Sequence, residues 1–231
     1  MVAIPGSNQS GSAGTASPAA SSGASSGSSV QPPDGFAYKK LLTGAGVLPA
    51  GWKIGGESDS GADASTPNTD DVGISAVSCQ DLGVNTASML LDYQSSYAEL
   101  NVDSNDGPGD TPDVSLNGFL PGNATKALAD VRKLAARCHT FSGDSTSPGT
   151  YTTTVAPVSV SGADQALVVE MTTPSGSSDF TDAYWLFAQY GNTIVGADEL
   201  TWSPSESGDT QHFPSMAASL GNKVGQASAN G

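Results

Sequence analysis

The stretch NATKALADVRKLAARC, residues 123–138, decides the fold class. Its apolar residues recur every three or four positions, which is the spacing of a helix with one buried face. They are Ala127, Leu128, Val131, Leu134, Ala135 and Cys138. Asn123 precedes them and can cap the helix through its side-chain oxygen. We therefore predict an amphipathic helix here, and the segments on either side determine what it packs against.

Four β-favouring runs follow this helix, at residues 151–158, 166–172, 181–190 and 193–200. The dipeptide Gly191-Asn192 between the last two is a two-residue hairpin signal. Before the helix, residues 88–93 and 97–102 also favour strands, and a turn through residues 94–96 would pair them as a hairpin.

Two further helices are predicted nearer the chain ends, over residues 37–48 and 214–226, because their apolar residues are spaced as on a helix. The order helix, strands, helix, strands, helix predicts an α+β fold, with a central antiparallel β-sheet and helices packed on one face. The polar, acidic stretches 55–71 and 105–113 read as surface loops.

The first 33 residues contain no charged and no aromatic side chain, and Ser, Gly and Ala dominate them. We predict a disordered spacer over residues 1–34, a single domain over 35–226 and a disordered tail over 227–231. The spacer lacks the basic start and apolar core of a signal peptide. Because such spacers commonly tether exported domains, we interpret the chain as mature and exported, secreted or attached to the outer face of the membrane. The alternative is a cytosolic protein with an unusual tail.

The negative charge of the chain argues against several classes of binding partner. The 231 residues hold 8 Lys and Arg against 23 Asp and Glu, a formal charge of −15. So few cations leave little with which to grip nucleic acid or an anionic membrane surface. No run approaches the length of apolar sequence that spans a bilayer. We expect a monomer whose only membrane contact would be a lipid anchor upstream of this chain.

The two cysteines, Cys79 and Cys138, suit a disulfide in an exported protein. The bridge would tie the end of the central helix to the segment before the first strands. Closing a loop of about 60 residues is worth about 4 kcal/mol in the chain-entropy model. The alternatives are two reduced thiols in a cytosolic protein or a zinc site, and zinc is disfavoured because no close CxxC or HxxxH pair is present. We expect neither a metal nor a cofactor.

Catalytic signals are weak. A hydrolytic nucleophile needs a neighbouring base, and the chain offers only His139 and His212, each near a predicted helix end. The one G-x-S-x-G match, residues 23–27, lies in the spacer without the strand and helix that the motif requires. The acidic loop 103–113 offers oxygen ligands for Ca²⁺ but not the EF-hand register, so we interpret it as solvated.

A basic stripe of Lys126, Lys133 and Arg137 lies opposite the apolar face of the central helix. It could meet an anionic ligand or partner. The alternative is a solvated face whose charges pair with nearby acids such as Asp130.

Two tryptophans are further candidates for ligand contacts. Trp52 stands in a turn and Trp202 just past a strand, so either could line a cleft or plug the end of a core. Trp185 lies within a strand, and we place it in the core.

Two motifs, LLxxxxxLPAGW at residues 41–52 and ARCxxF at 136–141, have Cys79 between them and the four-strand run after them. In this order they resemble the PknH-like extracellular sensor domain of actinobacterial receptor kinases and exported lipoproteins, over residues 36–226. The resemblance implies an exported α+β domain with flanking helices and a ligand cleft, and it implies no catalytic residues. The chain departs from the kinase sensors in lacking a kinase domain and in having one cysteine pair where the type member has two.

These observations favour a non-enzymatic, extracytoplasmic ligand- or partner-binding domain of sensor type, attached to the cell envelope. Its partner would be a small molecule, an envelope component or a protein. One alternative is a secreted hydrolase that uses His139 or His212. The other is a structural or adhesive cell-wall protein.

Overall fold

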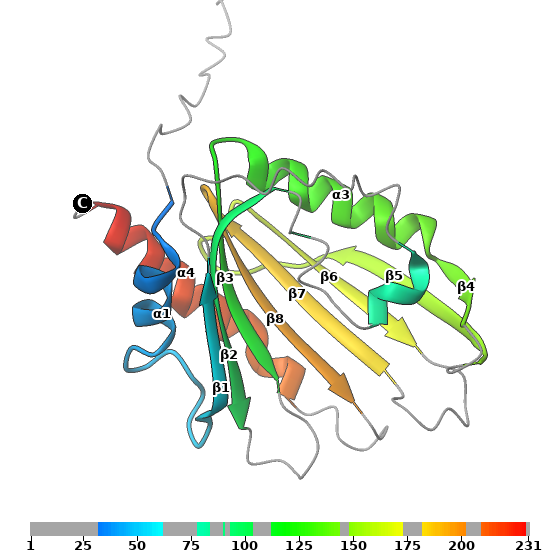
Figure 1. Cartoon of the computed structure of the whole chain (residues 1–231), viewed down its shortest axis with the longest axis horizontal. Coiled ribbons are helices and arrows are strands. Elements are labelled where there is room, and N and C mark those ends of the chain that lie inside the picture. The colour runs from blue at the N-terminus through cyan, green and yellow to red at the C-terminus, as the bar shows by residue number, and fades with distance from the viewer. Residues whose placement is uncertain are drawn as a thin grey trace, which may run out of the picture.

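The computed structural model describes residues 32–61, 78–83, 90, 93–103, 112–143, 148–172, 182–201 and 209–229. Within these residues eight strands form one antiparallel sheet, in the order β1-β2-β3-β8-β7-β6-β5-β4 (Figure 1). The strands are β1 (Lys53–Gly61), β2 (Gln94–Asp103), β3 (Asp113–Phe119), β4 (Thr140–Ser142), β5 (Thr150–Pro157), β6 (Gln165–Thr172), β7 (Asp182–Tyr190) and β8 (Thr193–Thr201). The described helices are α1 (Gly35–Leu42), α3 (Asn123–Arg137) and α4 (Phe213–Ala229), with short 3₁₀ helices η2 (Cys79–Gly83) and η3 (Asp209–His212). The α+β class with an antiparallel sheet is confirmed.

The helices cover both faces of the sheet, so the expectation of helices on one face is wrong. Strand β7 shows the arrangement, since successive side chains of a strand point to opposite faces. Leu186 and Ala188 lie in the core that α1 and α4 cover. Trp185 and Phe187 lie in the core that α3 covers (Figure 1). A strand that is apolar on both sides is typical of a sheet buried between two layers, and the unbroken run from Ala183 to Ala188 carried that signal.

On the α1/α4 face the helices themselves bring large side chains to the core. Tyr38 and Leu42 of α1 and Phe213, Met216 and Leu220 of α4 are all buried. They pack on apolar residues of the central strands, including Leu100, Val114, Leu116, Leu186 and Val195. The Tyr38 hydroxyl lies 2.8 Å from the Thr193 hydroxyl, so the one polar atom of this ring is hydrogen-bonded.

On the opposite face α3 packs on the side of the sheet formed by β5, β6 and β7. Its buried residues are Ala124, Ala127, Leu128, Val131, Leu134 and Ala135. The disulfide between Cys79 and Cys138 fastens the end of α3 to η2 and is confirmed. The predicted amphipathic helix is also confirmed, but Asn123 does not cap it. Gly122 occupies the N-cap with a φ of 82°, and the Asn123 side chain accepts instead from Lys126.

Strands β5 to β8 match the predicted runs, and the Gly191-Asn192 hairpin joins β7 to β8 as expected. The hairpin predicted through residues 94–96 is wrong, because these residues belong to β2, which pairs with β1 and β3. Part of the predicted loop 55–71 is strand, since β1 continues to Gly61.

Helix α4 runs to Ala229, three residues into the predicted tail. The described residues contain no helix with both the length and the apolar character needed to cross a bilayer.

Candidate ligand-binding cleft

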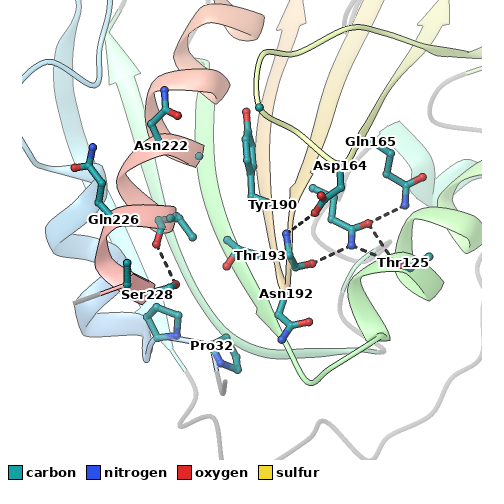
Figure 2. Close-up of a pocket in the computed structure, with 18 of the residues that line it drawn as sticks. Pro32, Thr125, Asp164, Gln165, Tyr190, Asn192, Thr193, Asn222, Gln226 and Ser228 are labelled. Atoms are coloured by element: carbon teal, nitrogen blue, oxygen red, sulfur yellow. Dashed lines mark hydrogen bonds between the residues drawn. The ribbon is translucent and has the colours of Figure 1, made fainter. Parts of the chain in front are cut away.

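A cleft of about 1280 Å³ opens at the end of the sheet, around the β7–β8 turn (Figure 2). One wall is the second half of α4. The other is built from the β7–β8 turn, the start of β6 and the first turn of α3, and Pro32 and Pro33 complete the rim. The cleft therefore lies where both helical layers end, and residues of both layers line it.

The turn itself is held in place by Asp164. Its Oδ2 accepts a hydrogen bond of 2.7 Å from the Gly191 backbone N–H, and its own N–H donates to the Gln189 carbonyl at 2.8 Å. Gly191 has a φ of 59°, a left-handed conformation that glycine adopts without strain. The loop before β6 and the β7–β8 turn are thus one hydrogen-bonded unit.

A chain of side-chain amides extends from this unit towards α3. Gln189 is 6% exposed; its Nε2 donates to the Gly191 carbonyl at 2.9 Å and to the Thr125 hydroxyl at 3.1 Å. Its Oε1 accepts from Gln165 Nε2 at 2.7 Å, and Gln165 Oε1 accepts from Arg132 at 2.9 Å. Because each group fixes the next, this wall is ordered before any ligand arrives.

The α4 wall is shaped by two glycines one turn apart. Gly221 packs against the Tyr190 ring so closely that a Cβ at this position would overlap the ring. Gly225 faces open space, with nothing near the position of a Cβ. Beside them the exposed amides of Asn222 and Gln226 line the cleft, with no hydrogen-bond partner among the described residues (Figure 2).

Tyr190 separates the two walls, between Asn222 and Asp164 (Figure 2). Its hydroxyl donates to the Ser161 carbonyl at 3.2 Å. Burial raises the pKa of Tyr190 to about 12, so the phenol is neutral at physiological pH. The ring therefore offers the cleft an uncharged aromatic surface.

The residues that line the cleft are mostly polar or glycine, and almost all of them are uncharged. Among the described residues that line it, Asp164 is the only charged side chain, and that carboxylate already accepts the Gly191 N–H. Amides, hydroxyls and glycines make up most of the rest. Such a lining can recognise a ligand through hydrogen bonds, and it holds no cation for a phosphate or carboxylate.

The predicted ligand contacts lie elsewhere. Trp52 is half-buried beside α4, with its ring edge-on to His212 at 5.7 Å and to Phe213 at 6.5 Å between centroids. The basic stripe lies on α3, over the other face of the sheet, so the structure does not bring it together with Trp52. Trp202 lies outside the described residues. None of the three stripe residues, Lys126, Lys133 and Arg137, lines the cleft, and their binding roles stay predictions.

The basic stripe has local partners, as its alternative interpretation anticipates. Lys133 Nζ lies 2.8 Å from Asp130 Oδ1, and Lys126 Nζ donates to Asn123 at 3.3 Å. Tyr93 donates to the same Asp130 carboxylate at 2.7 Å. Burial acts to raise the pKa of Asp130. The hydrogen bonds from Lys133 and Tyr93, together with the Lys133 charge, outweigh burial, so the pKa is lowered.

The two histidines have structural surroundings. His139 Nδ1 lies 3.0 Å from the Thr153 carbonyl, and the Thr153 N–H donates to the His139 carbonyl at 3.0 Å, so this residue is part of the join between α3 and β5. His212 packs on Trp52. Residues 23–27 and 104–111, the serine motif and most of the acidic loop, lie outside the described residues. Within the described ranges, no three His, Cys, Asp or Glu side chains converge as metal ligands would.

Sequence reasoning missed every residue of this cleft. One local signal was present in the closing helix, where Gly221 and Gly225 are each followed by an amide, Asn222 and Gln226. Two glycines four residues apart inside a predicted helix weaken it unless something packs against them. Reading them as a wall would have required knowing that the β7–β8 turn lies opposite.

No family model matches the sequence, and no curated protein sequence matches it. Among solved structures, the crystal structure of the extracellular domain of PknH from Mycobacterium tuberculosis aligns with 85% of this chain and 98% of its own. The two are 17% identical, with a TM-score of 0.44. A likeness this distant carries no argument about function.

Proposed function

We propose that this chain is an exported, non-enzymatic domain of sensor type that binds its ligand in the cleft at the β7–β8 turn. The observation that carries the proposal is the ordered amide wall facing an open, glycine-lined helix. A preformed concave site with a few fixed polar groups is the usual form of a ligand-binding site.

Export is supported by the disulfide. Cys79 and Cys138 are joined across 59 positions of sequence, and such bridges persist in oxidising compartments and are rare in the cytosol. The Ser/Gly/Ala-rich first 31 residues join the domain at Pro32, on the rim of the cleft. If that segment tethers the domain to the cell envelope, the cleft opens beside the point of attachment. The sequence resemblance to exported sensor domains points the same way.

Binding without catalysis is supported by the chemistry of the lining. General acid–base chemistry needs a titratable group close to the reacting atoms, usually with a shifted pKa. In the cleft, the Asp164 carboxylate accepts the Gly191 N–H, and the Thr125 hydroxyl accepts from Gln189. These groups are committed to holding the wall in shape.

The test compares ligand-induced thermal stabilisation of three proteins. Wild type is screened by calorimetric melting against a library that spans sugars, nucleotides, amino acids and fatty acids. A ligand at a hundred times its Kd stabilises the fold by about 2.7 kcal/mol, which raises Tm measurably. Gly225→Leu places a side chain in the open space of the cleft, and Ala227→Leu adds the same side chain to an exposed position of α4 that does not line it.

We expect at least one compound to raise Tm of wild type and of Ala227→Leu but not of Gly225→Leu. Mass spectrometry of the same mixtures should recover that compound unchanged. A hit that stabilises Gly225→Leu equally would place binding outside the cleft. Conversion of the hit to products by wild type would show that the domain is an enzyme.

A further inference from the structure

We propose that the ligand of this cleft is a neutral oligosaccharide, an inference that rests on the proposed function of the cleft as a binding site. The juxtaposition behind it is a pair of exposed amides on α4 across the Tyr190 ring from the hydrogen-bonded wall of Asp164, Gln165 and Gln189 (Figure 2).

The charge of the lining excludes the commonest anionic ligands. Nucleotides, phosphosugars and carboxylates are recognised by Arg, Lys or clustered backbone N–H groups. The described lining residues include no Lys, Arg or His and have Asp164 as their one charge. The chain has a formal charge of −15, so its electrostatic field would also repel an anionic ligand.

The same lining is unsuited to lipids. A site for an acyl chain is built of large apolar side chains. Here the lining offers Val224, which is 3% exposed, the Tyr190 ring, and small or cyclic residues at the rim. Most of the other lining residues are amides, hydroxyl-bearing residues or glycines.

Amides match sugar hydroxyls in their chemistry. Each Asn or Gln side chain offers two N–H donors and a carbonyl acceptor, and each sugar hydroxyl is both donor and acceptor. Asn222 and Gln226 stand four residues apart on α4, about one helical turn, and both belong to the lining of the cleft. They can each take a hydroxyl pair of successive sugar units. The part of the half-buried Tyr190 ring that Gly221 does not cover is the aromatic surface that the cleft can offer to the C–H groups of a sugar.

The size of the cleft indicates several sugar units. Its volume of about 1280 Å³ is above the 300–1,000 Å³ of drug-sized sites. A peptide is the other polymer that could fill such a space, and peptides commonly add a strand to a free sheet edge. The cleft offers no such edge, because β7 and β8 are paired on both sides within the sheet.

The experiment is isothermal titration of the full 231-residue chain with four linear hexasaccharides: maltohexaose, cellohexaose, isomaltohexaose and chitohexaose. We expect at least one to bind with a Kd below about 1 mM. The double variant Asn222→Ala, Gln226→Ala should weaken the affinity for that sugar by about tenfold or more, since it removes hydrogen bonds worth about 1 kcal/mol each. Gly225→Leu should abolish binding, and Ala227→Leu should leave it unchanged.

Three anionic or apolar probes and one peptide run in parallel: ATP, inositol hexakisphosphate, laurate and a Gly-Ser hexapeptide. If one of these binds in a Gly225→Leu-sensitive way and no hexasaccharide does, the saccharide inference is overturned while the binding function stands. If none of the eight probes gives cleft-dependent heat and the broader library gives no cleft-dependent shift in Tm, both fail. Sugar binding that Gly225→Leu does not reduce would place the saccharide site elsewhere and overturn the inference. Thermal melts of the variants without ligand verify that each is folded.

Discussion

The two faces of the sheet are covered in different ways. On one face α1 and α4, from opposite ends of the described chain, pack large side chains such as Tyr38, Phe213 and Leu220 against the strands. On the other face α3 brings mostly alanine, leucine and valine. It is also fastened at its two ends, by the disulfide at Cys138 and by the hydrogen bond of Thr125 to Gln189.

The difference indicates how a chain rich in small residues keeps three layers together. Burying an alanine removes far less apolar surface from water than burying a phenylalanine or leucine, so α3 itself contributes less apolar surface to its core than α1 and α4 do, and large strand residues such as Trp185 and Phe187 fill much of it. A covalent bridge and a hydrogen-bonded amide chain supplement it. The cleft lies where the two layers meet at the end of the sheet, with Gly221 and Tyr190 belonging to one and Gln189 and Thr125 to the other.

The largest expected effect comes from removing the fastening of α3. Cys79→Ser combined with Cys138→Ser should lower the free energy of unfolding by about 4 kcal/mol, because the unfolded chain regains the entropy of a long loop. Guanidinium titration followed by far-UV circular dichroism measures it. Reducing agent should destabilise wild type to a similar extent and leave the double variant unchanged. Equal stability of wild type and variant would show that α3 is held by packing alone.

The opposite face should respond to the loss of packing. Leu220→Ala, at a fully buried position of α4, should lower the free energy of unfolding by about 3 kcal/mol, from lost transfer energy and the cavity left behind. Leu41→Ala on α1, where the side chain is only partly buried, is the matched control and should cost less. Equal losses at the two positions would contradict the assignment of Leu220 to the centre of this core.

Two glycines of α4 offer a pair of substitutions with opposite signs. Gly221→Ala should destabilise by about 1–3 kcal/mol, since the new methyl overlaps the Tyr190 ring and forces it to move. Gly225→Ala, one turn later in open space, should stabilise by up to about 1 kcal/mol through helix propensity. Thermal melting measures both. Gly221→Ala should also weaken any cleft ligand, because the displaced ring narrows the site.

The sequence predicted those parts of the fold whose residues carry a period. The amphipathic helix, strands β5 to β8 and the β7–β8 turn follow from local spacing and turn chemistry. The bridge between Cys79 and Cys138 follows from pairing the two cysteines of a chain that the sequence predicts to be exported. Strand β3 was missed although its apolar residues alternate with polar ones, because Asp113, Asn117 and Gly118 are of types that strands disfavour. Strand β1 was missed because its second half is glycine, serine and acid.

The cleft could not be read from the sequence for a different reason. Its walls come from positions as far apart as Pro32, Thr125 and Gln226, which only the packing of both layers brings together. Apart from the repeated Gly-amide pairs of α4, the amides and glycines of the cleft have no period that marks a binding face. Large aromatic and basic residues drew attention instead, and Trp52 and the stripe on α3 proved to lie on opposite faces of the sheet.

The smallest expected effect concerns strand β3, whose alternate side chains face the two layers. Val114 points into the α1/α4 core, while Asp113 points to the opposite side, where Asn101 donates a hydrogen bond to it and Asp198 is its partner on β8. Burial raises the pKa of Asp113, and the hydrogen bond from Asn101 only partly offsets this. Protonation of Asp113 is therefore easier in the folded chain than in the unfolded chain.

The Asp113 carboxyl makes the fold less stable as pH rises. Because the pKa of Asp113 is higher in the folded chain than in the unfolded chain, the protonated carboxyl contributes to stability. That contribution is fully present below the pKa of Asp in the unfolded chain, about 3.9, and is lost as pH rises through the folded pKa. Asp113→Asn keeps an acceptor for Asn101 but never acquires a charge. Its urea midpoint should therefore equal that of wild type at pH 3 and lie slightly above it at pH 7. A difference of the same size at both pH values would mean that the gain comes from packing and not from the carboxylate, and the polar side of β3 would then tolerate charge as well as it tolerates amides.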